Sequence, residues 1–124
     1  VFLAKNARKD DVIVTKSGLQ YKVISEGDGD YTPTENDEVT VHYRGTFIDG
    51  TEFDSTYKRN EPYRVKVKQL IPGWTEALKM MSEGAKWELY IPADIAYGER
   101  GSGNYVGPNA TLIFEVELLD IEKS

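Results

Sequence analysis

The chain has 124 residues and no cysteine, which excludes disulfides, thiol nucleophiles and cysteine metal sites. Its formal net charge is −6, which argues against binding to nucleic acid or to an anionic membrane surface. The 40% hydrophobic and 29% charged content indicates one soluble globular domain, and no apolar run approaches the roughly 20 residues that would insert into and span a bilayer.

The first residues differ from the rest of the chain. The stretch VFLAKNARKDD is polar and mixed in charge, with a short apolar start at Phe2 and Leu3. Two interpretations stay open, the end of a helix and a loosely held terminus. We therefore treat residues 1–14 as an N-terminal extension and expect the main domain over residues 15–124.

Apolar and polar residues alternate along most of the remaining chain, which is typical of half-buried β-strands. The alternating segments are residues 19–23, 39–47, 63–67, 85–91 and 112–118. Asp49-Gly50 predicts a tight turn after the second of these segments, with a further strand leaving it at Thr51. The sheet is therefore expected to be largely antiparallel.

The segment LIPGWTEALKMM predicts a short helix after Gly73, because Trp74, Leu78 and Met81 recur at helical spacing. Gly84 is predicted to be its left-handed C-cap. A single amphipathic helix cannot bury its apolar face alone, so we expect it on the concave face of the sheet, in the α+β class. Trp74 is unusual in a first helical turn, where a polar cap is common.

The common catalytic groups are missing. His42 is the only histidine, and it falls on the polar side of a predicted strand. No serine motif supports a triad, and no ligand spacing supports a zinc site. We therefore expect His42 to be a structural or surface residue, and we expect no metal and no cofactor.

Aromatic residues are frequent near the predicted turns. One interpretation is ordinary core packing, which we expect for Phe47 and Trp87. The other is an apolar cleft with a few polar groups. The residues of such a cleft would be Trp74 as its floor, Tyr43, Phe53 and Phe114 as its walls, and Asp54 and Tyr97 as its polar groups.

Four segments occur in order across roughly residues 15–123: VHYRGTFIDGTEFDSTYKRNEPYRV, LIPGWTEALKMMSEGAKWELYIP, AYGERG and NATLIFEVELLDI. In this order and spacing they resemble the FKBP-type peptidyl-prolyl cis–trans isomerases. SGLQYKVISEGDG and IPADIAYGERG are most similar to the macrophage infectivity potentiator (Mip)-like branch. The resemblance implies a twisted antiparallel sheet of five to six strands wrapped around one short helix. It also implies acceleration of X–Pro bond rotation in peptides and folding proteins.

The resemblance implies a dry aromatic pocket in which a proline ring lies on Trp74. The catalytic residues that it implies are Asp54, Tyr97 and Tyr43. The substrate-binding residues that it implies are Phe53, Arg59, Tyr63, Leu70, Ile71, Trp74, Tyr105, Val106 and Phe114. Sensitivity to FKBP-binding macrolides is expected through this pocket. The loop Ser102–Pro108 departs from the family pattern of a histidine and paired isoleucines, and we expect it to be more polar.

A second function stays open, a non-catalytic proline-binding, peptide-binding or chaperone module with the same fold and cleft. Retention of Trp74, Phe53, Asp54 and Tyr97 together favours an enzyme. The expected partners are proline-containing peptides, unfolded proteins and macrolide inhibitors. Mip-like relatives are typically exported and often dimerise through a long N-terminal helix. By this analogy we expect a secreted, periplasmic or surface-associated protein, and a monomer because the chain contains at most the end of such a helix.

Overall fold

The structure is a computed structural model that describes residues 2–27, 29, 32–96 and 111–123. Within these residues, seven strands form one antiparallel sheet in the order β1-β2-β6-β7-β3-β4, and β5 also pairs with β3. The strands are β1 (Ile13–Val14), β2 (Gln20–Ser25), β3 (Glu38–Phe47), β4 (Glu52–Ser55), β5 (Tyr63–Lys66), β6 (Lys86–Ile91) and β7 (Leu112–Glu122). The helices are α1 (Phe2–Asn6), α2 (Thr56–Arg59) and α3 (Pro72–Leu78), with 3₁₀ turns η1 (Val67–Gln69) and η2 (Ala93–Ile95).

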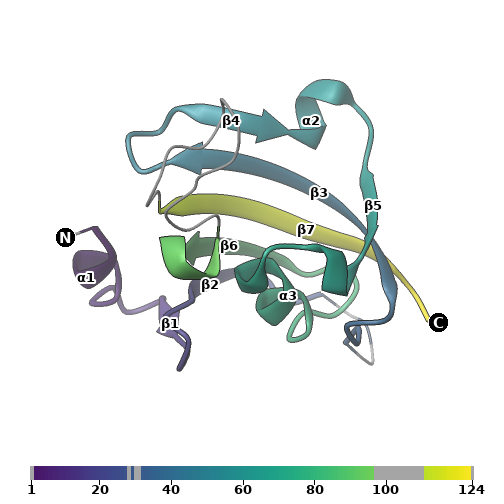
Figure 1. Ribbon diagram of the computed structural model, residues 1–124, viewed down its shortest axis with the longest axis horizontal. Helices are drawn as coiled ribbons and strands as arrows, with labels where there is room; N and C mark the ends of the chain where they lie inside the picture. The colour runs from purple at the N-terminus through teal and green to yellow at the C-terminus, as the bar shows by residue number, and fades with distance from the viewer. Residues whose placement is uncertain (1, 28, 30–31, 97–110, 124) are drawn as a thin grey trace.

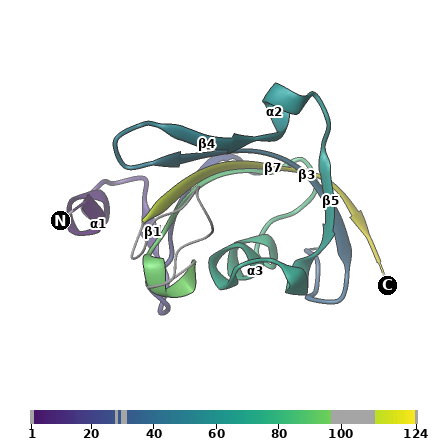
Figure 2. The same cartoon turned by 45° about the horizontal axis from the view of Figure 1, so that its top comes forward.

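The sheet curves over α3, with β3 and β7 at its centre (Figures 1 and 2). Alternate residues are buried from Val39 to Gly45 of β3 and from Leu112 to Leu118 of β7, whereas the residues between them are only partly buried or exposed. The buried set from these strands and α3 includes Val39, Val41, Tyr43, Leu112, Phe114, Val116, Leu118, Trp74, Ala77 and Leu78. The core therefore lies between α3 and the concave face, which confirms the α+β class and the antiparallel sheet around a short helix.

The sheet contains one more strand than the sequence predicts. The additional strand is β1, which the alternation pattern does not reveal because it is only two residues long. Ile13 and Val14 are about half exposed, so they show no burial pattern that a sequence could reveal. Their pairing with Tyr21 and Gln20 is instead seen in the backbone register. Residues 2–6 form α1, while the domain boundary at residues 14 and 15 stays a prediction. None of the helices in the described part of the chain is long and apolar enough to cross a membrane.

The limits of the main helix differ from the prediction. The helix begins at Pro72 and ends at Leu78, so Gly84 is not its C-cap, and that prediction was wrong. Met81 is fully buried in the turns that follow the helix. Its apolar side chain therefore continues the helical spacing of the sequence beyond Leu78, the last residue of the helix. Gly84 does adopt a positive φ of 87°, but its N–H donates to Leu118 O at 2.8 Å and so joins this turn to β7.

Candidate functional site

A cleft of about 360 Å³ opens between the concave face of the sheet and the beginning of α3. Its lining comes from the central strands β3 and β7, the edge strand β4, β5, and the connection from η1 into α3. The described lining residues are Tyr43, Phe53, Asp54, Tyr63, Gln69, Leu70, Ile71, Trp74 and Phe114. Asp54 is the only charged side chain in this set, so the described walls are mainly aromatic and aliphatic.

Trp74 is held as a rigid plate in the cleft. Its ring meets Tyr43 edge-on at 5.1 Å and 89°, and it meets Phe114 at 5.1 Å and 82°. Only 4% of its surface is exposed. Edge-to-face contacts of this kind favour one ring orientation, because the positive edge of one ring lies against the negative face of the other.

Gly73 allows Trp74 to reach this position. A Cβ atom at Gly73 would lie 2.6 Å from Ile91 Cγ2, so only glycine lets the first turn of α3 pack this closely on β6. Pro72 at the start of the helix supplies a φ that suits the first turn. Thr75 Oγ1 then donates to Val67 O at 2.8 Å, which ties α3 to η1 and positions the connection that carries Leu70 and Ile71.

A second glycine shapes the opposite wall. A Cβ atom at Gly45 would lie 2.7 Å from Phe53 Cζ and 2.9 Å from Phe114 Cε1. The two rings therefore rest directly on the β3 backbone, and they meet each other at 5.6 Å and 83°. Phe47 packs behind Phe53 with ring centroids 4.8 Å apart. Because Gly45 has no side chain, it determines how closely the two rings of this wall lie against β3.

The polar part of the cleft is a pair of residues on neighbouring strands. Tyr43 donates its phenolic hydrogen bond to Asp54 Oδ2, and the Ser55 N–H donates to Asp54 Oδ1 at 2.9 Å. Thr56 Oγ1 accepts from the Tyr43 N–H at 2.8 Å and lies 2.8 Å from His42 Nδ1. His42 thus supports the join between β3 and α2, and its ring stacks on Tyr57 at 4.9 Å.

The structure brings eight of the predicted site residues together in one cleft: Tyr43, Phe53, Asp54, Tyr63, Leu70, Ile71, Trp74 and Phe114. Their roles stay predictions. Tyr97, Tyr105 and Val106 lie outside the described residues, as does the side chain of Arg59. Of the two aromatics expected in the core, Trp87 is buried and stacks on Tyr21 at 4.3 Å, whereas Phe47 is only partly buried.

Gln69 is a lining residue that the sequence did not predict. Its side-chain oxygen accepts from the Lys66 N–H at 3.3 Å, so it caps the turn that leads to the cleft rim. The only available signal was its position directly before Leu70 and Ile71. Within the part of the chain that the structure describes, no group of three or more histidine, aspartate or glutamate side chains is placed to bind a metal ion.

Known proteins share both the sequence and the fold. Residues 29–119 match the family model described as FKBP-type peptidyl-prolyl cis-trans isomerase. Residues 1–23 match a model described as the domain amino terminal to that isomerase. The FKBP-type 22 kDa peptidyl-prolyl cis-trans isomerase of Escherichia coli is 53% identical over 97% of this chain and 58% of its own. The outer membrane protein MIP of Legionella longbeachae is 51% identical over 99% of this chain and 52% of its own.

Solved structures agree with these sequence matches. FkpA from Escherichia coli superposes with a TM-score of 0.94 and 43% identity, over 98% of this chain and 56% of that one. A peptidyl-prolyl cis-trans isomerase from Pseudomonas syringae pv. tomato superposes with a TM-score of 0.91 and 36% identity, over 98% of this chain and 89% of that one. The chain spans about half the length of the curated relatives that it matches. The cleft residues, the family match and these superpositions agree: the chain belongs to the FKBP-type peptidyl-prolyl cis-trans isomerase family.

Proposed function

We propose that this chain accelerates cis–trans isomerisation of X–Pro bonds in peptides and unfolded proteins. The observation that carries the proposal is the Trp74 plate, fixed between Tyr43 and Phe114 at the floor of a cleft lined mainly by aromatic and aliphatic residues. A flat aromatic floor with close aromatic walls suits a proline ring. Membership in a family named for this activity supports the same conclusion.

The reaction needs no nucleophile because no bond is broken. Rotation about the amide must cross a barrier of about 20 kcal/mol, and it takes tens to hundreds of seconds without a catalyst. The twisted amide loses resonance, so its carbonyl becomes less polar and its nitrogen becomes pyramidal. A cleft in which Asp54 is the only described charged side chain disfavours the planar, more polar ground state relative to that twisted state.

Individual residues take distinct roles in this proposal. Trp74 supports the proline ring, while Tyr43, Phe53 and Phe114 restrict its movement so that the preceding residue rotates instead. The Ile71 N–H donates to a substrate carbonyl, and none of the described residues accepts a hydrogen bond from it. Asp54 orients Tyr43 and directs its carboxylate toward the rotating amide.

The remaining proposed roles concern Tyr97, which would donate to a substrate carbonyl, and Arg59, Tyr63, Leu70, Tyr105 and Val106, which would line the substrate path. Macrolides of the FKBP-binding kind would compete for the same cleft. We also propose an exported, periplasmic or surface-associated location, because a relative with 51% identity is named as an outer membrane protein. The monomeric state stays a prediction.

The activity is tested by measuring cis-to-trans isomerisation of a short Leu-Pro or Phe-Pro peptide, with and without an FKBP-binding macrolide. We expect acceleration that the macrolide abolishes. The chain has two tryptophans, and both are buried, so Trp74→Phe and Trp87→Phe form a matched pair. The first should lower kcat/KM and the second should not. A folded wild-type protein that gives no acceleration would refute the enzyme and leave the proline-binding module.

A further inference from the structure

A second groove, of about 590 Å³, lies along the outer side of α3. It is lined by Glu35, Lys68, Leu70, Pro72, Thr75, Glu76, Lys79 and Met80. Leu70 lines both this groove and the cleft that contains Trp74. The two hollows are therefore neighbours that share one partly buried leucine side chain as a wall.

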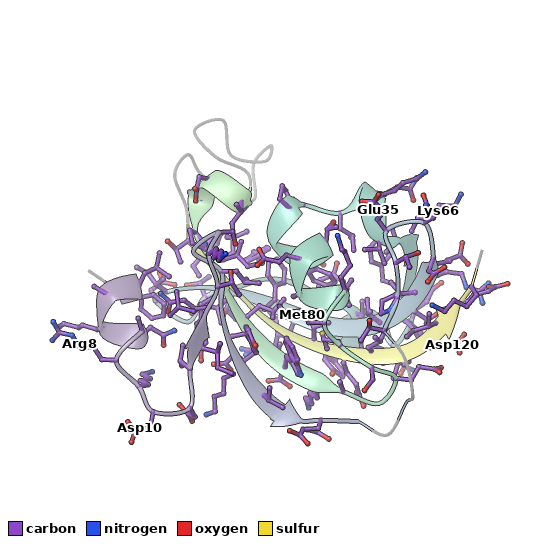
Figure 3. The ribbon with its side chains drawn as sticks, turned by 90° about the horizontal axis from the view of Figure 1, so that it is seen from below. Arg8, Asp10, Glu35, Lys66, Met80 and Asp120 are labelled. Atoms are coloured by element: carbon purple, nitrogen blue, oxygen red, sulfur yellow. The ribbon has the colours of Figure 1, made fainter. Side chains whose placement is uncertain are left out.

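The groove follows one face of the helix. The lining residues repeat at helical spacing on one side of α3 and continue into the turn that follows it: Pro72, Thr75, Glu76, Lys79 and Met80. The opposite side of the helix is buried and consists of Trp74, Ala77 and Leu78. The helix rises about 9 Å from Pro72 to Leu78, and the turn at Lys79 and Met80 continues the groove, which gives it the length of about three to four residues of extended chain. Figure 3 looks onto α3 from below and shows Met80 and Glu35 beside it.

The chemistry of the groove favours an uncharged apolar occupant. Lys68 and Lys79 are balanced by Glu35 and Glu76, so the groove is neutral although the whole chain has a net charge of −6. Leu70, Pro72 and Met80 supply apolar surface, and Met80 is 39% exposed. A methionine adapts to side chains of different shapes because it is unbranched and polarizable.

The walls of the groove are formed before any partner binds. Thr75 Oγ1 donates to Val67 O and lies 3.5 Å from Leu70 O, which fixes the leucine backbone between the two hollows. The Lys68 N–H donates to Glu35 O at 3.0 Å, and Ser17 donates a hydrogen bond to Glu76. A preformed groove requires less ordering when a polypeptide binds.

We propose that a polypeptide substrate continues from the proline cleft over Leu70 into this groove. An apolar side chain about four residues from the proline then packs against Met80. This inference rests on the proposed function and extends it. Unfolded proteins, which present apolar side chains near their prolines, are better substrates than tetrapeptides because only they reach both hollows.

The test compares peptides of about twelve residues that contain one X–Pro bond and either Leu or Ser about four residues away, a spacing set by the groove length. One pair places this residue before the proline, and a second pair places it after. In one of the two pairs, the Leu peptide should have a KM about fivefold lower than the Ser peptide, with kcat unchanged. Partial burial of one aliphatic side chain stabilises the ground state and the transition state equally. A tetrapeptide serves as the substrate that reaches only the cleft.

Met80→Glu should remove the preference for Leu while tetrapeptide kinetics and the unfolding temperature stay unchanged. Leu119→Glu is the matched control, because Leu119 is 37% exposed and lies on β7, outside the groove. The inference is overturned if wild type treats Leu and Ser peptides alike, if Met80→Glu keeps the preference, or if Leu119→Glu also loses it.

The same peptides are also titrated by tryptophan fluorescence, which separates this inference from the proposed function. Tighter binding of the Leu peptide that Met80→Glu abolishes would support the groove even if no peptide were isomerised faster. Equal binding of Leu and Ser peptides by an active enzyme would refute the groove and leave the isomerase intact.

Discussion

Tyr43 on β3 donates its phenolic hydrogen bond to Asp54 on β4, and the ring of the same tyrosine meets Trp74 at 5.1 Å. One side chain therefore joins the carboxylate of the cleft to its aromatic floor. The Ser55 N–H donates to the other carboxylate oxygen at 2.9 Å, so Asp54 is restrained at both oxygens. The geometry of the polar group and the geometry of the aromatic floor therefore depend on each other.

Asp54→Leu should lower kcat/KM for a short X–Pro peptide about 10- to 100-fold, because a hydrogen bond to a charged group contributes about 1.5–3 kcal/mol. Tyr43→Phe should cause a smaller loss, because it keeps the ring against Trp74. Glu52→Gln is the control, since Glu52 lies on the same strand but outside the described lining of the cleft. Wild-type kinetics in both Asp54→Leu and Tyr43→Phe would remove the pair from the mechanism.

Gly45→Ala should raise KM and lower the free energy of unfolding by about 1–3 kcal/mol, because the added methyl group overpacks the wall. The new Cβ atom would lie 2.7 Å from Phe53 Cζ, so the phenylalanine ring must move into the cleft. Urea unfolding and peptide kinetics measure the two effects. The cost of Gly45→Ala should be smaller in a Phe53→Leu background, and equal costs in the two backgrounds would contradict the contact.

Lys123→Met should lower the free energy of unfolding by about 1–3 kcal/mol, because Lys123 lies 3.1 Å from the buried Asp37 carboxylate. Lys22→Met breaks an exposed lysine–aspartate pair with Asp11 at 3.3 Å and should cost less than about 1 kcal/mol. Denaturant unfolding of both variants gives the comparison. If Lys22→Met is as costly as Lys123→Met, burial of the aspartate does not determine the strength of the pair.

Stability should fall as the pH rises above about 10, where unfolded tyrosines begin to lose protons. Burial and the hydrogen bond to Glu88 raise the pKa of Tyr90, and burial raises the pKa of Tyr57. The hydrogen bond to Glu115 raises the pKa of Lys86. In this range the native state keeps protons that the unfolded state releases, so the slope of unfolding free energy against pH is negative.

Tyr90→Phe should make that slope shallower, although removal of its hydrogen bond to Glu88 lowers stability at neutral pH. The measurement is the unfolding free energy from pH 8 to about 11, the range that brackets the tyrosine and lysine reference pKa values. Constant or rising stability across this range in the wild type would contradict the three raised pKa values.

Some features of the fold follow directly from local sequence. The alternation from Val39 to Phe47 predicted a strand with one buried face, and Val39, Val41 and Tyr43 are buried as that pattern requires, whereas at its end Thr46 is buried and Phe47 is only partly buried. Asp49-Gly50 predicted the turn between β3 and β4, in which Gly50 has a φ of 90° and Asp49 accepts from the Thr51 N–H. Periodicity and turn chemistry act over a few residues, so a sequence can report them.

Other features depend on contacts between distant segments. The sequence pattern places the end of α3 too late because Met81 is buried in a turn, and periodicity detects burial without distinguishing helix from turn. The hydrogen bond from the Gly84 N–H to Leu118 O cannot be predicted from neighbouring residues, because it joins segments far apart in the chain.

Residue type, spacing and motif predicted the fold class and the family resemblance, and that resemblance implied the eight described residues that line the cleft. The place of Gln69 among them, the hydrogen bond from Tyr43 to Asp54 and the position of Leu70 between the cleft and a second groove follow only from the packing of distant segments. A cleft is formed by surfaces that lie apart in the sequence. Its depth, its neighbours and its shared walls exist only after the sheet has curved over α3 (Figure 2).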